Sequence, residues 1–151
     1  MEELKEFKTA LEEILEKVNA KLEADDNKYW TVGGSGEITN LSDYSDNFDR
    51  FKKNIGNYFK TKKEAEDYLE NLKVKTEIKK IAKELNGDRK INWRDEDQFK
   101  YYLFYYYTSI GMGNTCLLKQ EGTTYCLDEN FKEECISRIG KERLEIYLKR
   151  N

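Results

Sequence analysis

Few residue types in this chain are suited to catalysis or to metal binding. The 151 residues include 30 acidic residues and three cysteines but no histidine. Without histidine there is no Ser-His or Cys-His catalytic pair and no imidazole ligand for a metal ion. Cys116, Cys126 and Cys135 form no C-x-x-C pair, so we expect buried, reduced thiols and neither a zinc site nor a disulfide framework. The sequence therefore predicts a protein that is not an enzyme and that holds no metal and no cofactor.

Three aspartates recur at every third position of one polar segment: Asp43, Asp46 and Asp49. A calcium-binding loop requires the order D-x-[DN]-x-[DN]-G with a distal glutamate, and that order is missing here. We therefore expect a solvated acidic loop. The three aspartates are included among the candidate partner-binding residues.

The densest aromatic run of the chain occupies residues 101–107. In a strand, alternate side chains point to opposite faces. We assign one face to the core because it contains the aliphatic Leu103; this face comprises Tyr101, Leu103, Tyr105 and Tyr107. The other face, Tyr102, Phe104 and Tyr106, is the candidate contact face, since tyrosine is favoured at interfaces. This second face is covered either by the rest of the chain or by a partner, and the sequence leaves both possibilities open.

Lysines are crowded in the segment that follows Phe59. They are Lys60, Lys62, Lys63, Lys73, Lys75, Lys79, Lys80 and Lys83. Together with stacking tyrosines they provide an alternative function, the binding of nucleic acid or of a nucleotide. Acidic residues alternate with these lysines, so a solvated face with ion pairs is the favoured interpretation. The net charge of −3 also differs from that of dedicated nucleic-acid binders, and direct nucleic-acid binding is not expected.

The first element that must position these residues is an amphipathic helix over residues 2–24. Its apolar stripe follows heptad spacing and consists of Leu4, Phe7, Leu11, Ile14 and Val18. Three heptads are marginal as an isolated helix, so the stripe must be buried against the body of the protein or against a second copy. We predict a homodimer to which this N-terminal arm contributes.

The remaining chain divides into two similar units. In residues 28–90, strands at 29–32 and 37–39 flank a glycine-rich turn, polar residues 40–54 and an extended segment 55–60 follow, and a capping box formed by Thr61 and Glu64 starts a helix that ends at Gly87.

In residues 91–151 we expect a strand at 99–108, a turn at 111–114, strands at 115–119 and 123–127, a helix capped by Asp128, and a last helix at 141–150. An offset of 67 residues relates the two units. The predicted fold is α+β: an N-terminal helical arm, residues 1–27, followed by a tandem repeat of antiparallel strands plus helix, residues 28–90 and 91–151.

Several short motifs of the first unit also carry a family resemblance. They are Tyr29-Trp30, Gly36, Arg50, the run from Ile55 to Glu66, Leu72-Lys73 and Glu77-Ile78, and near the end of the chain Ile139–Arg143 and Tyr147-Leu148. With these motifs the chain resembles a widespread family of small, uncharacterised phage and prophage accessory proteins. It departs from the family in residues 99–118.

The resemblance implies a phage-encoded accessory protein, and some phage accessory proteins of this size antagonise host defence. The function expected from it is the binding and inhibition of a host defence protein, as anti-CRISPR proteins do, without enzymatic activity. The expected partner is therefore a host protein such as a CRISPR effector. The expected location is the cytoplasm of the host cell, which also suits the reduced cysteines.

Overall fold

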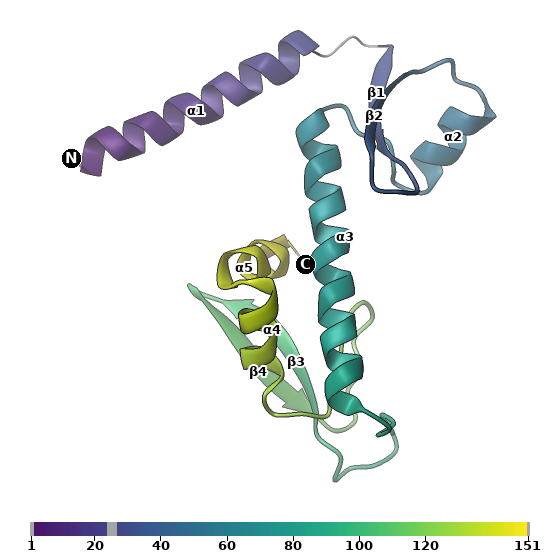
Figure 1. The fold of residues 1–151 in the computed structure, drawn as a ribbon, viewed down its shortest axis with the longest axis vertical. Helices are drawn as coiled ribbons and strands as arrows, with labels where there is room; N and C mark the ends of the chain where they lie inside the picture. Colours follow the sequence, from purple (N-terminus) through teal and green to yellow (C-terminus); the bar gives the residue numbers. More distant parts are fainter. Residues whose placement is uncertain (1, 24–26, 151) are drawn as a thin grey trace. The chain divides into compact units, whose positions relative to one another are not determined.

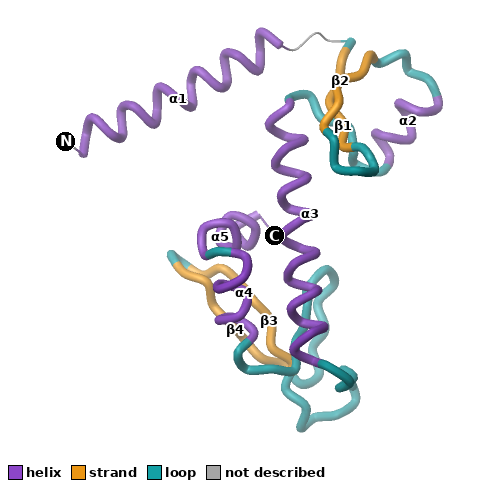
Figure 2. Tube along the Cα trace, viewed as in Figure 1, coloured by secondary structure: helices purple, strands orange, loops and turns teal. Residues whose placement is uncertain are grey.

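The computed structural model describes residues 2–23 and 27–150 of the chain. These residues form five helices and two small antiparallel sheets, which confirms the predicted α+β class (Figure 1, Figure 2). Two compact units can be distinguished: unit 1, Met1–Glu70, and unit 2, Asn71–Asn151. Each unit is described by itself.

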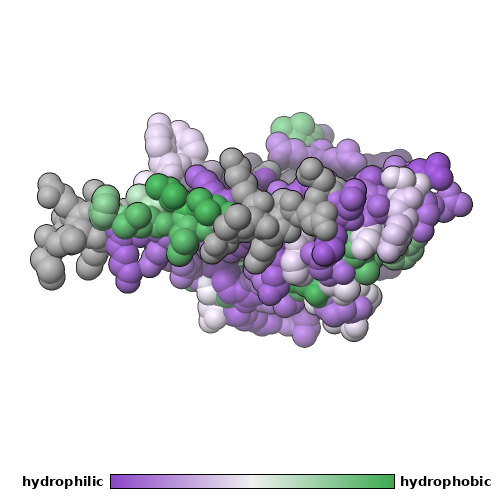
Figure 3. All heavy atoms as spheres, turned by 90° about the horizontal axis from the view of Figure 1, so that it is seen from above, coloured by the Kyte–Doolittle hydropathy of each residue, from purple (hydrophilic) through white to green (hydrophobic). Residues whose placement is uncertain are grey.

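Helix α1, Glu2–Glu23, matches the predicted arm. Its side chains are described for residues 7–18, and there the apolar stripe of Phe7, Leu11, Ile14 and Val18 is exposed. Figure 3 shows these apolar side chains gathered along the helix. The fifth residue of the predicted dimer contact, Leu4, lies in the helix, and its side chain is outside the described residues.

Strands β1, Lys28–Val32, and β2, Ile38–Ser42, form the antiparallel hairpin of unit 1. The turn between them is the predicted glycine-rich one, and Gly36 adopts a φ of 85°, which suits a residue without Cβ. The predicted extended segment 55–60 is reduced to a bridge in which Phe59 and Trp30 exchange backbone hydrogen bonds of 2.7 and 2.9 Å.

Helix α2, Asn47–Asn54, corrects the prediction of a polar loop over residues 40–54. Asp46 is its N-cap, and the Asp46 carboxylate accepts the backbone N–H of Asp49 at 2.9 Å. The sequence analysis did not predict this helix; its two aromatic residues, Phe48 and Phe51, are three positions apart, and both are exposed.

Helix α3, Lys62–Asn86, begins and ends where the sequence predicts. The Thr61 hydroxyl accepts the N–H of Glu64 at 3.2 Å, and the Glu64 carboxylate accepts the N–H of Thr61 at 3.1 Å, so the capping box is confirmed. Gly87, with a φ of 56°, donates its N–H to the carbonyls of Lys83 and Glu84 and closes the helix.

Strands β3, Lys100–Tyr106, and β4, Ser109–Thr115, form the antiparallel hairpin of unit 2. The turn predicted at 111–114 is wrong: those residues lie inside β4, and the chain turns at Tyr107 and Thr108 instead. Of the predicted strands at 115–119 and 123–127, the structure pairs only Thr115, the last residue of β4, and Cys126, in a single bridge with Tyr101; the rest of both predictions is wrong.

Two short helices complete unit 2: α4, Phe131–Ile139, and α5, Lys141–Arg150. Asn130 is the N-cap of α4 in place of the predicted Asp128, whose carboxylate accepts the N–H of Asn130 at 2.9 Å. The core of the unit combines one face of α3 with the hairpin and both short helices. Its buried residues are Val74, Ile78, Ile81, Ala82, Ile110, Cys126, Phe131, Cys135, Ile139 and Leu144.

The predicted tandem repeat is not confirmed by this arrangement. The first hairpin is followed by α2 and the 25-residue α3, whereas the second is followed by the short helices α4 and α5, of 9 and 10 residues, so the order of elements recurs but the helices differ in length. The signals that the two segments share at the 67-residue offset are local, namely a strand end followed by a helix start.

Candidate protein-binding surface

The outer face of the β3–β4 hairpin carries the aromatic side chains at the even positions of β3. Tyr102 and Phe104 are neighbours, with ring centroids 6.1 Å apart. Each ring covers a glycine of β4: a Cβ atom on Gly113 would lie 2.7 Å from the Tyr102 ring, and one on Gly111 would lie 2.5 Å from the Phe104 ring. The two glycines of β4 therefore leave space for the rings. They lie in a strand and do not form a turn.

The exposed part of this face lies at the end of the hairpin. Phe104 is 37% exposed, Tyr106 61% and Tyr107 82%. Tyr107 was predicted to face the core, but it occupies the turn with a φ of 54°, and its ring lies 4.3 Å from that of Tyr106. We call Phe104, Tyr106 and Tyr107 the aromatic tip.

The other end of the outer face is covered within unit 2. The Tyr102 ring lies 5.8 Å from the buried ring of Tyr125, which in turn lies 4.9 Å from Trp93. Tyr102 is half-buried as a result, so this candidate contact residue also has a structural role.

A buried lysine at the start of β3 was not found by sequence reasoning. Lys100 is fully buried, and its ammonium group donates to the carbonyls of Asp95 at 3.0 Å and of Cys116 at 2.7 Å. It also lies 5.5 Å from the centre of the Trp93 ring. The two carbonyl groups lie 5 and 16 residues away in the sequence, and backbone acceptors of this kind leave no pattern of side chains that could have revealed the burial.

The inner face of β3 agrees with the prediction at two of its four positions. Tyr101 and Leu103 pack against the core of unit 2. Tyr105 is half-buried, and the ammonium group of Lys149 lies 4.7 Å from its ring centre.

The three aspartates of the polar segment form an internal hydrogen-bond network in unit 1. Asp49 is 3% exposed, and its carboxylate accepts the Tyr29 hydroxyl at 2.7 Å and the N–H of Tyr44 at 2.8 Å. Asp43 accepts the Tyr58 hydroxyl at 2.6 Å and the Lys53 ammonium at 2.8 Å. The expectation of a solvated acidic loop is therefore corrected: Asp49 holds the segment onto the hairpin through Tyr29, and Asp43 joins the start of the segment to Lys53 and Tyr58.

This network shifts the pKa values of its members. Hydrogen bonds from Lys53 and Tyr58 hold the pKa of Asp43 well below its usual range. Burial, followed by the hydrogen bond to Asp49, raises the pKa of Tyr29 far above that of an ordinary tyrosine. Both shifts favour the states that complete the network, namely an ionised Asp43 carboxylate and a protonated Tyr29 hydroxyl.

The predicted partner-binding residues form two groups in the structure, one in each unit. Tyr102, Phe104 and Tyr106 share the outer face of the hairpin in unit 2. Asp43, Asp46 and Asp49 share the network of unit 1, where only Asp46, the N-cap of α2, is exposed.

The lysine-rich segment lies mainly on α3. At the start of this helix, Lys62 is 3.6 Å from Glu66 and Lys63 is 3.5 Å from Asp67, both with i,i+4 spacing. These contacts agree with the favoured interpretation of a face with ion pairs.

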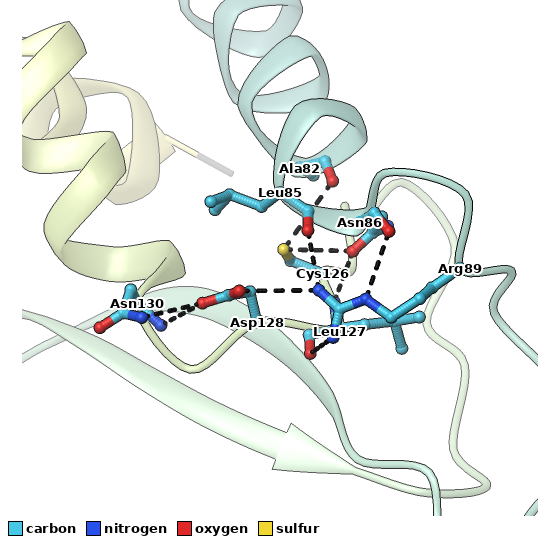
Figure 4. Close-up of polar contacts among 8 residues, drawn as sticks. All are labelled: Ala82, Leu85, Asn86, Arg89, Cys126, Leu127, Asp128 and Asn130. Carbon is cyan, nitrogen blue, oxygen red and sulfur yellow. Dashed lines mark hydrogen bonds and ion pairs between the residues drawn. The ribbon is translucent and has the colours of Figure 1, made fainter.

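The end of α3 is fastened to the segment that precedes α4, as Figure 4 shows. The side-chain oxygen of Asn86 accepts the N–H of Leu127 at 2.7 Å and the Cys126 thiol at 3.4 Å. Arg89 donates to the carbonyl of Leu127 at 3.3 Å, and it lies 3.6 Å from the carboxylate of Asp128.

All three cysteines are free thiols in the structure, and two of them belong to the core of unit 2. Burial raises the pKa of the Cys126 thiol, and burial next to Cys126 raises that of Cys135 to about 12. Both thiols are therefore protonated at neutral pH, whereas a nucleophile or a metal ligand must be a thiolate.

Within residues 2–23 and 27–150, no helix is long and apolar enough to cross a membrane. The same residues contain no group of three or more acidic or cysteine side chains arranged to hold a metal ion. Comparisons of the chain with protein-family models, with curated proteins and with solved structures find no match. The resemblance to phage accessory proteins therefore stays a prediction.

Proposed function

We propose that this chain is a non-enzymatic binding protein and that the aromatic tip of unit 2 is its contact surface. The observation that carries the proposal is the exposure of Phe104, Tyr106 and Tyr107 at the end of one hairpin, where the rings of Tyr106 and Tyr107 are in contact. Single exposed aromatic residues are common, but adjacent ones form a patch whose burial by a partner is favourable. Tyrosine is also among the residues that contribute most to binding energy at interfaces.

The class of partner follows from the resemblance to phage accessory proteins. In this proposal the partner is a host defence protein, which this chain inhibits by occupying its surface in the host cytoplasm. The alternative, binding of nucleic acid through the lysine-rich helix, has less support because Lys62 and Lys63 already lie next to acidic side chains.

The proposal includes a homodimer formed through α1. The candidate contact is the stripe of Leu4, Phe7, Leu11, Ile14 and Val18, of which the four residues with described side chains are exposed. Heptad spacing suits a second copy of the same helix, because matching stripes interlock in a coiled coil.

Affinity capture with paired variants tests the aromatic tip. The chain would be immobilised and incubated with bacterial lysate, and the captured proteins identified by mass spectrometry. We expect the double variant Tyr106→Ala, Tyr107→Ala to lose a partner that the unchanged chain captures. The control is Tyr44→Ala, Phe48→Ala, which removes two exposed aromatic rings from unit 1.

Two outcomes would argue against this proposed function. Equal capture by both double variants and the unchanged chain would remove the aromatic tip as the contact. Binding to single-stranded DNA in a filter assay, with a steep loss of affinity on raising the salt concentration, would favour the nucleic-acid alternative.

A further inference from the structure

One edge of strand β3 has backbone groups that the rest of unit 2 leaves unpaired. Tyr101 exchanges two hydrogen bonds with Cys126, N–H to carbonyl at 2.7 Å and the reverse at 2.9 Å, on the side of β3 that faces away from β4. Successive residues of a strand point their backbone groups to alternate sides. The N–H and C=O groups of Leu103 and Tyr105 must therefore point to the same side as those of Tyr101.

The chain segment that could have paired with Leu103 and Tyr105 turns away from them. Antiparallel pairing continued from the Cys126 bridge would place Thr124 opposite Leu103 and Gly122 opposite Tyr105. Instead, Gly122 has a φ of 80°, and the N–H of Thr123 bonds to the carbonyl of Gln120 at 3.4 Å, which closes a turn. No backbone hydrogen bond to this edge of Leu103 or Tyr105 is found in the described part of the chain.

Tyr125 holds this turn in place. Its hydroxyl accepts the N–H of Gln120 at 2.9 Å, and its ring is fixed between Tyr102 and Trp93. The aromatic packing of Tyr125 therefore keeps residues 120–124 apart from β3.

A cavity of about 420 Å³ occupies the separation. One wall is β3 from Tyr102 to Tyr105, and the opposite wall is residues 120–124. Ile78 of α3 and Leu148 of α5 also line the cavity, and Lys75 and Glu121 add one charge of each sign. The cavity therefore places unpaired backbone donors and acceptors beside an aliphatic surface.

We infer that this cavity is a binding slot for an extended peptide segment of a partner protein, which adds a strand to the open edge of β3. An extended backbone is the ligand that matches alternating N–H and C=O groups, as in other cases of strand addition. The alternation of its side chains would place every second residue against Ile78 and Leu148, so the segment carries apolar residues at alternate positions.

The slot shares Phe104 with the aromatic tip but not Tyr106 or Tyr107, and the inference does not rest on the proposed function. Variants at Tyr106 and Tyr107 test the tip, whereas variants at the β3 edge test the slot. A protein that binds peptides through the slot and captures nothing through the tip would keep this inference and reject the other.

Amide exchange of the isolated full chain, followed by NMR, is the first test. We expect the N–H groups of Leu103 and Tyr105 to exchange at least tenfold faster than those of Tyr102 and Phe104, which face β4. Equal protection of all four would mean that the segment 120–124 closes on β3 in solution, and it would overturn the inference.

The second test uses a displayed library of random linear 12-residue peptides as the probe. We expect selected peptides to have apolar residues at alternate positions, and to slow the exchange of the Leu103 and Tyr105 amides when bound. Selected peptides that leave both amides unprotected, or a library without binders, would overturn the inference.

Paired variants at one position separate the backbone contact from the side chain. Tyr105→Pro removes the outward N–H, whereas Tyr105→Ala removes the same ring and keeps the N–H; proline is tolerated at an edge whose N–H is unpaired. We expect the proline variant to bind a selected peptide at least about tenfold more weakly than the alanine variant. Equal affinities would count against strand addition.

Two further variants keep the result interpretable if Tyr105→Pro lowers the melting temperature too far. Thr124→Trp fills the slot from its opposite wall and leaves β3 unchanged, so peptide binding should be lost. Asn114→Pro makes the same backbone change on the exposed opposite edge of the hairpin, and should leave binding unchanged.

Discussion

At the scale of single residues, the glycines of this chain serve two different purposes. Gly36, Gly87 and Gly140 have positive φ values of the kind that turns and helix ends require. Gly111 and Gly113 adopt strand conformations, and their value is the space they leave for the rings of Phe104 and Tyr102. A glycine in a strand often marks such a close approach.

Gly111→Ala should therefore lower the free energy of unfolding by about 1 kcal/mol, since its Cβ would displace the Phe104 ring. Urea denaturation measures this change. The control is Gly34→Ala, whose Cβ would meet no atom within 4 Å. In the Phe104→Ala background the cost of Gly111→Ala should fall nearly to zero; an undiminished cost would show that the ring is not its cause.

At the scale of elements, local chemistry explains where the helices start and end. It does not explain which surface covers each apolar stripe. The capping box of Thr61 and Glu64 forms because both partners lie within four residues of each other. The stripe of α1 needs a second surface that the sequence of the helix does not specify.

Sedimentation measures whether α1 forms the dimer. Leu11→Asp with Ile14→Asp places two charges in the stripe, and the full chain should change from dimer to monomer, because a buried unpaired charge is costly. The control is Glu12→Gln with Glu13→Gln on the charged face, which should leave the dimer intact. A monomeric unchanged chain, or a dimer that survives both aspartates, would exclude α1 as the contact.

At the scale of the whole molecule, folding raises the pKa values of several tyrosines and cysteines. Burial is the first cause of the raised pKa values of Tyr29, Tyr58, Tyr147, Cys126 and Cys135. The unfolded chain therefore releases these protons at lower pH than the folded one. This contribution to stability is complete below the ordinary thiol and tyrosine pKa values, about 8.5 and 10, and is lost as the pH rises above them.

The free energy of unfolding should accordingly fall between about pH 8.5 and 10.5. Urea denaturation at a series of pH values measures the slope. Tyr29→Phe should reduce the slope above pH 10, because it removes one of the protons whose pKa folding raises. An equal slope in the variant and in the unchanged chain would mean that the Tyr29 proton does not contribute.

The sequence by itself determined the elements whose signals are local. It predicted α1 from heptad spacing, the first hairpin from its glycine-rich turn, and α3 from its capping box and Gly87. The aromatic strand β3 and the inward direction of Tyr101 and Leu103 also followed from composition and alternation.

Only the tertiary structure decided the features that depend on distant partners. Asp49 is buried because the Tyr29 hydroxyl, 20 residues away, reaches it. Tyr125 holds residues 120–124 away from β3 through a cluster of rings, so a segment with the composition of a strand remains unpaired. In each case a contact between residues far apart in the sequence outweighed the local preference, and such contacts leave no periodic pattern in a single sequence.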